Sequence, residues 1–239
     1  MRFTLAALCL SVLAMTAPAG AQAPGPAPGP APGPAPMVGP LYVVTYMEFA
    51  DDHVNRAGAA LTDYRNKALR ESGNSNVELF AETGQSNRFV AVEMWASAEH
   101  HQTHAKGPGD SPKADWMKQG ALAPADVRLH KRYNPAGAMA PNTKAVYAIT
   151  HVDVPPPTLA TLEAIIKPLV EKSRAEAGFM RFDIVQSTTR PNHFTFIEGW
   201  ESAEAAQAHA LAPHTREFRE KLHPILGALY DQRYYKFMP

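Results

Sequence analysis

The chain has 239 residues, of which 45% are hydrophobic, and its 23 Lys and Arg residues are balanced by 23 Asp and Glu residues. This balance leaves no basic field for nucleic acid or anionic lipid, so neither is expected as a partner. Cys9 is the only cysteine and lies in a segment that we expect to be removed, which excludes disulfides, thiolate metal sites and cysteine nucleophiles from the mature protein.

The first residues have the features of a secretory signal peptide. Arg2 supplies a positive charge, residues 5–15 form a short apolar core, and residues 19–21 (AGA) match a small-residue cleavage site. The apolar run is too short to act as a stop-transfer helix. We therefore predict a cleaved signal peptide over residues 1–21 and a periplasmic or secreted protein without membrane contact after cleavage. A retained membrane anchor is the alternative.

A linker is predicted to follow the signal peptide. Residues 22–40 repeat Ala, Pro and Gly, a composition that favours an extended and solvated polyproline II chain. Glycine recurs at every fourth position here, whereas collagen requires it at every third. We interpret the segment as a disordered spacer.

The rest of the chain contains one pattern twice. Residues of the first copy recur 105 positions later in the second copy, without a gap from residue 42 to residue 105. The matches include Glu93, Trp95, Ser97, Ala98, Glu99, Gln102 and His104, which recur as Glu198, Trp200, Ser202, Ala203, Glu204, Gln207 and His209. So long a period indicates a duplicated domain, because solenoid repeats are shorter. We assign residues 41–134 to domain 1 and residues 144–239 to domain 2.

Both copies are predicted to contain the same secondary-structure elements. In the first copy the patterns predict strand 41–49, helix 52–71 ended by Gly73, strands 75–83 and 87–95, a helix that begins near Ser97, and strand 126–133. In the second copy they predict strand 144–153, helix 157–176 with a kink at Pro168, strands 179–188 and 193–200, helical segments over 202–229 broken near Pro213, and strand 230–237. A glycine-rich stretch at 107–111 is expected to form a loop in the first copy.

The order β-α-β-β-α-β is that of the ferredoxin-like unit. Along strand 87–95 the two faces are both largely apolar, which suits a sheet that is covered on both sides. Helices cover one face, and the sister copy is the economical cover for the other. We therefore predict an α+β fold in which two tandem ferredoxin-like (βαββαβ) repeats pack sheet-to-sheet as an intramolecular α+β barrel.

The sequence also resembles a known family. Residues 194–204 (FTFIEGWESAE), followed by His209, resemble the signature of the antibiotic biosynthesis monooxygenase (ABM) family, and residues 88–95 with His104 repeat that pattern. The resemblance covers most of both repeats. It implies a dimeric α+β barrel, here fused into a pseudo-dimer within one chain, and leaves homo-oligomers open. Some members oxidise quinols or polyketide anthrones with O₂ and without metal or flavin.

Other members of the family degrade haem, and the resemblance allows this branch to be compared. That branch expects Asn on the first strand, Trp at the position of His209 and an axial His at the position of Arg219. This chain has Tyr46 and His151 near the Asn position, and His104 and His209 at the Trp position. Haem degradation therefore ranks below the other activities.

The repeated motif supplies the candidate catalytic residues. We expect His209 and His104 to take the hydroxyl proton of a quinol, because the pKa of histidine lies near working pH. Glu198 and Glu93 are expected to act as hydrogen-bond anchors. The alternatives are a histidine that packs at an interface and a glutamate that accepts structural hydrogen bonds.

Aromatic residues supply the candidate substrate-binding side chains. We expect Trp200 and Trp95 to form pocket walls, and a second set on the first strand of each copy to line the barrel, although plain core packing is the alternative for all of them. This second set comprises Tyr147, Tyr42, His151 and Tyr46. No cofactor and no metal site are expected. The cluster of His100, His101 and His104 offers only a weak zinc or copper alternative, since no Asp or Glu completes it.

Together these features predict an exported, cofactor-independent monooxygenase that acts on a small phenolic or quinol-type aromatic with O₂. A non-catalytic ligand-binding barrel protein of the envelope is the alternative, and a structural protein without a pocket is the third interpretation.

Overall fold

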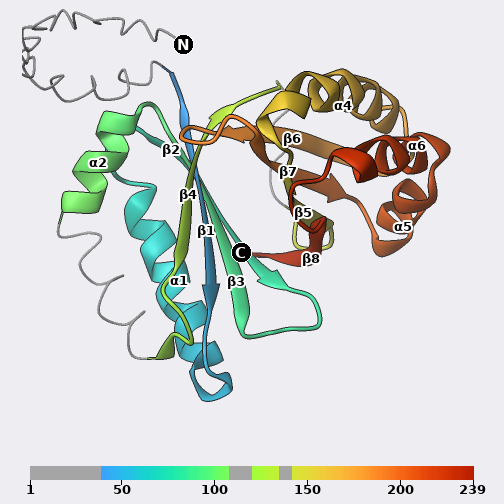
Figure 1. Cartoon of the computed structure of the whole chain (residues 1–239). Coiled ribbons are helices and arrows are strands. Elements are labelled where there is room, and N and C mark those ends of the chain that lie inside the picture. Colours follow the sequence, from blue (N-terminus) through green and yellow to red (C-terminus); the bar gives the residue numbers. More distant parts are fainter. Residues whose placement is uncertain (1–38, 108–119, 135–141) are drawn as a thin grey trace, which may run out of the picture. The chain divides into compact units, whose positions relative to one another are not determined.

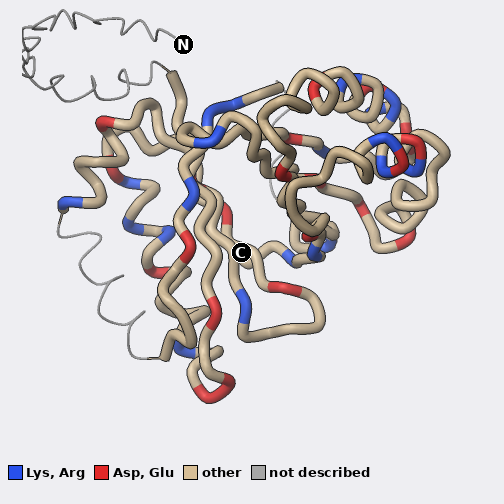
Figure 2. Tube along the Cα trace, viewed as in Figure 1, with Lys and Arg blue, Asp and Glu red and all other residues tan. Residues whose placement is uncertain are grey.

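A computed structural model of the chain describes residues 39–107, 120–134 and 142–239, and all structural statements below concern these residues (Figure 1). The predicted signal peptide, nearly all of the predicted linker and most of the predicted loop at 107–111 lie outside them. No helix in the described ranges is both long and apolar enough to cross a membrane. Acidic and basic residues are interspersed along both repeats (Figure 2).

The first repeat contains the predicted elements in the predicted order. They are β1 (Leu41–Glu48), a 3-10 turn (Asp51–His53), α1 (Val54–Ala68), β2 (Asn74–Glu82), β3 (Arg88–Trp95), α2 (Ala98–Lys106) and β4 (Asp126–Arg132). Ser97 caps α2, because its side chain accepts a hydrogen bond from the backbone N–H of His100. Gly73, between α1 and β2, has a φ of +81°, which explains why glycine stands there.

The second repeat follows the same plan. Its elements are β5 (Val146–Asp153), a 3-10 turn (Pro156–Thr158), α4 (Leu159–Ser173), β6 (Phe179–Ser187), β7 (His193–Trp200), α5 (Ala203–Leu211), α6 (Pro213–Leu222), a 3-10 turn (His223–Ile225) and β8 (Asp231–Met238). The break predicted near Pro213 separates α5 from α6. The helical prediction over 202–229 extends too far, because the last helical turn ends at Ile225. The backbone N–H of Gly227 instead donates to the carbonyl of Asp153.

The strands form a closed barrel in the order β1-β3-β2-β8-β5-β7-β6-β4. Within each repeat, the first strand pairs antiparallel with the third and the last. The last strand of each repeat also joins the sheet of the other: β8 pairs with β2, and β4 pairs with β6. This confirms two ferredoxin-like repeats closed into one barrel, and it shows that the closure depends on edge-to-edge pairing of the two sheets, in which each last strand keeps its place beside the first strand of its own repeat.

Strand alternation divides the side chains between the barrel interior and the helix-covered outside. Apolar and aromatic side chains from both repeats fill the interior, in a cluster comprising Tyr42, Val44, Phe80, Val90, Val92, Ala145, Tyr147, Ile149, Met180, Val185, Ile197 and Tyr235. On the outside, Phe89 and Ala91 of β3 pack with Leu61 and Tyr64 of α1. In the second repeat, Phe194 and Phe196 lie in a cluster with residues of α4 and α6.

One buried ion pair joins the two repeats. Nη1 of Arg181, on β6, lies 2.7 Å and 2.9 Å from the two carboxylate oxygens of Glu78, on β2. Nε of Arg181 is also 3.1 Å from the carboxylate of Asp183. Arg181 and Glu78 are only 5% and 3% exposed, so this is a charged contact inside the barrel wall rather than on the surface.

Candidate functional site

The predicted catalytic residues of the second repeat lie together between β7 and α5. Nδ1 of His209 is 2.7 Å from the carboxylate of Glu176, and its Nε2 is 3.3 Å from the carboxylate of Glu198. The indole N–H of Trp200 donates to the same Glu198 oxygen over 3.2 Å. The Trp200 ring is stacked on the His209 ring, with centroids 4.5 Å apart. His209 is therefore held between two carboxylates and against one aromatic face.

Hydrogen-bond geometry dictates where protons can lie in this group. Nδ1–H of His209 donates to Glu176, so Nε2 is the nitrogen that faces the oxygen of Glu198. If the ring were neutral and the carboxylate ionised, both atoms of that contact would be hydrogen-bond acceptors. A favourable contact therefore needs one proton between His209 and Glu198. Burial raises the pKa of Glu198, partly opposed by the charge of His209, which favours that carboxyl as the carrier of the proton. The group can hold and pass a proton.

The first repeat has the same arrangement with one addition. Nδ1 of His104 is 2.7 Å from the carboxylate of Glu71, and Trp95 donates to Glu93 over 3.0 Å. The hydroxyl of Tyr64 lies between the other two groups, 2.9 Å from Nε2 of His104 and donating to Glu93 over 2.8 Å. The position 105 residues after Tyr64 holds a leucine. A tyrosine thus bridges His to Glu in one repeat, and the contact is direct in the other.

We call these two groups the paired relays: Glu71, His104, Tyr64, Glu93 and Trp95 in the first repeat, and Glu176, His209, Glu198 and Trp200 in the second. Sequence reasoning predicted the His, Glu and Trp of each motif but missed the carboxylates on Nδ1 and missed Tyr64. The signal for the carboxylates was present, since Glu71 and Glu176 also differ by 105 positions. The two relay histidines are buried, each 4% exposed, whereas the side chains of Glu71 and Glu176 are partly exposed.

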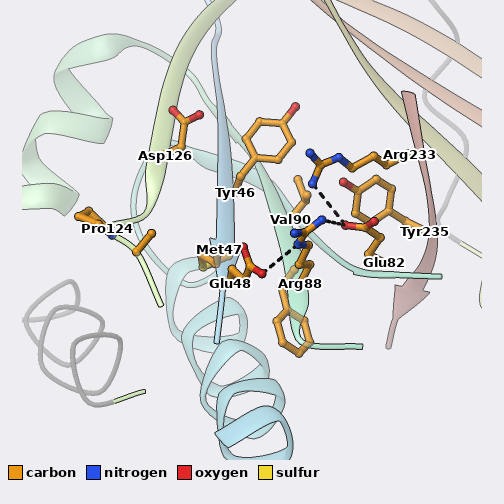
Figure 3. Close-up of a pocket in the computed structure, with 12 residues that line it drawn as sticks. Tyr46, Met47, Glu48, Glu82, Arg88, Val90, Pro124, Asp126, Arg233 and Tyr235 are labelled. Carbon is orange, nitrogen blue, oxygen red and sulfur yellow. Dashed lines mark ion pairs between the residues drawn. The ribbon is translucent and has the colours of Figure 1, made fainter. Parts of the chain in front are cut away.

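The larger cavities lie elsewhere, on the inner side of the sheets toward the end of the barrel, whereas a small one of about 50 Å³ lies between α4 and α6 and is lined in part by His214. One cavity of about 170 Å³ is lined by residues of both repeats, including Tyr46, Arg88, Arg233 and Tyr235. Its charged side chains form ion pairs (Figure 3). Arg88 is 3.2 Å from Glu48 and 4.0 Å from Glu82, and Arg233 is 3.6 Å from Glu82.

Two further cavities adjoin the second repeat. One of about 140 Å³ is lined by Tyr46, Arg128, His151 and Tyr235, among others. A larger cleft of about 560 Å³ is lined by Asp126, Val127, Arg128, Leu129, His130, His151, Asp153, Ser187, Thr189, Arg190 and His193. Tyr46 and His151 thus lie at cavities, as a substrate-binding role requires. Burial raises the pKa of Tyr46 to about 12, so its hydroxyl stays protonated at neutral pH.

The other predicted substrate-binding residues lie apart from these cavities. Tyr42 and Tyr147 belong to the interior core of the barrel and are 4% and 1% exposed. Trp95 and Trp200 are on the opposite, helix-covered face of the sheets. The structure therefore brings together the His, Glu and Trp of each relay, and it separates them from Tyr46 and His151.

His151 belongs to a cluster that sequence reasoning did not find. Its Nε2 lies 2.8 Å from Oδ1 of Asp153, and Nδ1 of His193 lies 2.7 Å from the same oxygen. Asp153 faces His193 across the β5–β7 pair, and His151 is two residues away on the same face of β5. Burial lowers the pKa of His193, partly opposed by the charge of Asp153. Alternation and strand register create this cluster, and the sequence alone does not give the register.

The chain belongs to the antibiotic biosynthesis monooxygenase family. The family profile matches residues 40–109 and again residues 145–221, one match in each repeat. The resemblance inferred from the repeated motif is thereby confirmed. No curated protein shows significant sequence similarity to the chain.

Solved structures confirm the fold over most of the chain. A candidate monooxygenase from Fusobacterium nucleatum superposes with a TM-score of 0.72 at 18% identity, covering 84% of this chain and 94% of that one. An anthrone oxidase-like protein gives a TM-score of 0.71 at 9% identity, covering 85% and 92%. A candidate monooxygenase from Lactobacillus acidophilus gives 0.66 at 14% identity, covering 83% and 94%. At these identities the likeness concerns the fold alone.

Proposed function

We propose that the protein is an exported monooxygenase that oxidises a small phenolic or quinol-type aromatic with O₂ and needs no resident metal or flavin for this reaction. Family membership and structural neighbours described as monooxygenases or anthrone oxidase-like support the reaction class. The N-terminal signal pattern supports export. The observation that carries the proposal is the paired relay, in which a histidine links two carboxylates, directly in the second repeat and through the hydroxyl of Tyr64 in the first.

The relay suits removal of a proton from a phenol. Glu176 fixes the ring of His209 through Nδ1, which leaves Nε2 as the nitrogen that can accept a proton. A phenol placed beside Nε2 would give its hydroxyl proton to the ring, and the resulting phenolate transfers an electron to O₂ more readily than the phenol does. The face of Trp200 on which His209 is now stacked would become available to the substrate ring once α5 moves away from β7.

Substrate can reach the relay only if the helix cover opens. His209 is 4% exposed and lies on α5, so α5 must move relative to β7 to admit a ring between His209 and Glu198. Such opening of a helix that covers an active site is common in enzymes and sets the turnover of many. The same holds for His104 on α2 in the first repeat.

The test is O₂ consumption by the tag-free protein with a panel of hydroquinones and anthrones. His209→Ala is expected to lower the rate by about 100-fold, the effect of losing a general base. His223→Ala, at an exposed histidine of the last 3-10 turn, is the matched control and should leave the rate unchanged. If the wild-type protein consumes no O₂ with any member of the panel, or if both variants retain full rate, the proposal is wrong.

The second candidate function is ligand binding without turnover. It is favoured by the position of the cavities, which are lined by Tyr46 and Tyr235 and lie on the sheet face opposite the relays. In this case the same hydroquinones would bind with a measurable heat, no O₂ would be consumed, and Tyr46→Ala rather than His209→Ala would abolish binding.

A further inference from the structure

Two histidines and one carboxylate converge at the end of β5 and the start of β7. Oδ1 of Asp153 is 2.8 Å from Nε2 of His151 and 2.7 Å from Nδ1 of His193, and the three ligand atoms all lie within 4.8 Å of one another. Zn²⁺ binds imidazole nitrogen and carboxylate oxygen at ~2.0–2.2 Å in tetrahedral geometry, so two ligand atoms on one ion lie about 3.4 Å apart. The observed separations are shorter than this by roughly 0.6 Å, so small side-chain rotations would bring the three atoms to the spacing of ligands on one ion.

The carboxylate of Asp153 has two imidazoles as its close neighbours. Oδ1 is buried and lies in ion-pair contact with both rings, without a well-formed hydrogen bond among the described residues. Such an oxygen is stabilised by a positive charge between it and the rings, either a proton or a metal ion. The short contacts to two imidazole nitrogens favour a cation, because nitrogen lone pairs and a carboxylate repel one another unless a proton or metal lies between them.

The first repeat shows what the same positions do without metal ligands. The residues 105 positions before His151, Asp153 and His193 are Tyr46, Glu48 and Arg88. There Arg88 forms an ion pair with Glu48 over 3.2 Å, as Figure 3 shows, so a fixed guanidinium supplies the positive charge. In the second repeat a histidine replaces that arginine, and the position of Tyr46 also becomes a histidine. Both changes replace a side chain that cannot bind a metal well with one that can.

We propose that His151, Asp153 and His193 form a binding site for a divalent first-row transition metal ion such as Zn²⁺ or Co²⁺. Two imidazoles and one carboxylate form a ligand set that suits these ions. Three protein ligands leave at least one coordination position open, and all three residues line the cleft of about 560 Å³. Arg128 and Arg190 line that cleft too, so the ligand completing the site is an anionic oxygen group such as a carboxylate or phenolate.

This site is separate from the relay of His209. On β7, His193 and Ile197 share the inner face of the barrel, whereas Glu198 and Trp200 lie toward the helices. The proposal therefore does not depend on the proposed oxygenation. Metal removal by a chelator should leave O₂ consumption by the relay unchanged, so the two proposals can fail independently.

The experiment uses the full, tag-free chain, freed of metal by chelation and dialysis. Co²⁺ is titrated with visible absorption as the readout and Zn²⁺ with calorimetry, and we expect one equivalent of either ion. Asp153→Asn and the double variant His151→Tyr with His193→Arg, which copies the first repeat, should each weaken binding by at least about 100-fold. Circular dichroism establishes that these variants are folded, and Asp153→Asn, which preserves volume, serves if the double variant does not fold.

A second histidine–carboxylate cluster supplies the control. Glu176, His209 and His214 also place ligand atoms within 4.8 Å of one another. His214→Ala should retain wild-type affinity for both ions if the site is at Asp153. The proposal is overturned if the wild-type protein binds neither ion, if Asp153→Asn binds as tightly as wild type, or if His214→Ala rather than Asp153→Asn abolishes binding.

Discussion

Replacing Arg181 by methionine is expected to lower the free energy of unfolding by about 3–5 kcal/mol, the usual cost of removing one partner from a buried ion pair. The guanidinium contacts Glu78 over 2.7 Å and Asp183 over 3.1 Å, and its loss leaves two carboxylates inside the barrel wall with only the charge of Arg132 remaining near Asp183. Burial already raises the pKa of Asp183, and the charge of Arg181 opposes that rise. Because Glu78 and Arg181 come from different repeats, the variant also loosens the contact between them.

Urea denaturation at neutral pH measures this effect, and a double-mutant cycle separates the pair from its surroundings. Glu78→Gln combined with Arg181→Met should recover part of the lost free energy of unfolding, because the double variant no longer buries the unpaired carboxylate of Glu78. Lys221→Met is the control, because its ion pair with Glu217 is more than half exposed on both sides and should be worth less than about 1 kcal/mol. Equal losses for Arg181→Met and Lys221→Met would contradict the assignment.

Stability is also expected to fall as the pH is lowered from about 6.5 to about 4, through His130. This ring is 1% exposed, donates from Nδ1 to the carbonyl of Arg128, and receives the hydroxyl of Thr195 at Nε2. Burial lowers its pKa to about 4, from an ordinary value of 6.5. The folded state thus favours the neutral ring. Above about pH 6.5 His130 is neutral in both the folded and the unfolded chain, so its burial does not reduce the free energy of unfolding there.

Below pH 6.5 the unfolded chain takes up a proton at His130 and the folded chain does not, so stability declines by about 1.4 kcal/mol per pH unit, or about 3 kcal/mol by pH 4. Urea midpoints measured at several pH values with a chelator present report the slope without any metal contribution. His130→Gln removes the titrating group. The free energy of unfolding of the variant should therefore rise relative to that of the wild type as the pH falls. Parallel curves for the two proteins would rule out this role for His130.

Much of the fold could be predicted from the sequence, because local patterns determine its elements. Ala57, Leu61, Tyr64 and Ala68 recur at helical spacing, and these are the residues that α1 buries. The closing pairings of β4 with β6 and of β8 with β2 could not be predicted in the same way. They join the edges of two sheets, and whether those edges meet depends on the twist and curvature of the sheets rather than on any local pattern.

The candidate site was predicted in part, for a related reason. The repeat made His104, His209 and their Glu and Trp partners visible, yet it said nothing about burial, which depends on how α2 and α5 pack on the sheets. Asp153 and His193 are forty residues apart and meet only because β5 and β7 pair in one register. A shift of one residue in that register would turn the side chains to opposite faces.

The closure of two repeats of one chain into a single barrel has a consequence for how this molecule can change over time. In a homodimer every substitution occurs twice, so a new residue must suit both active halves at once. Here the two halves are covalently one molecule, and each position is free to diverge from its counterpart while the shared barrel is preserved by β4 and β8. Tyr46 and Arg88 in the first repeat correspond to His151 and His193 in the second, and they illustrate such divergence. The first repeat has a fixed ion pair at these positions, and the second has the histidines of the proposed metal site.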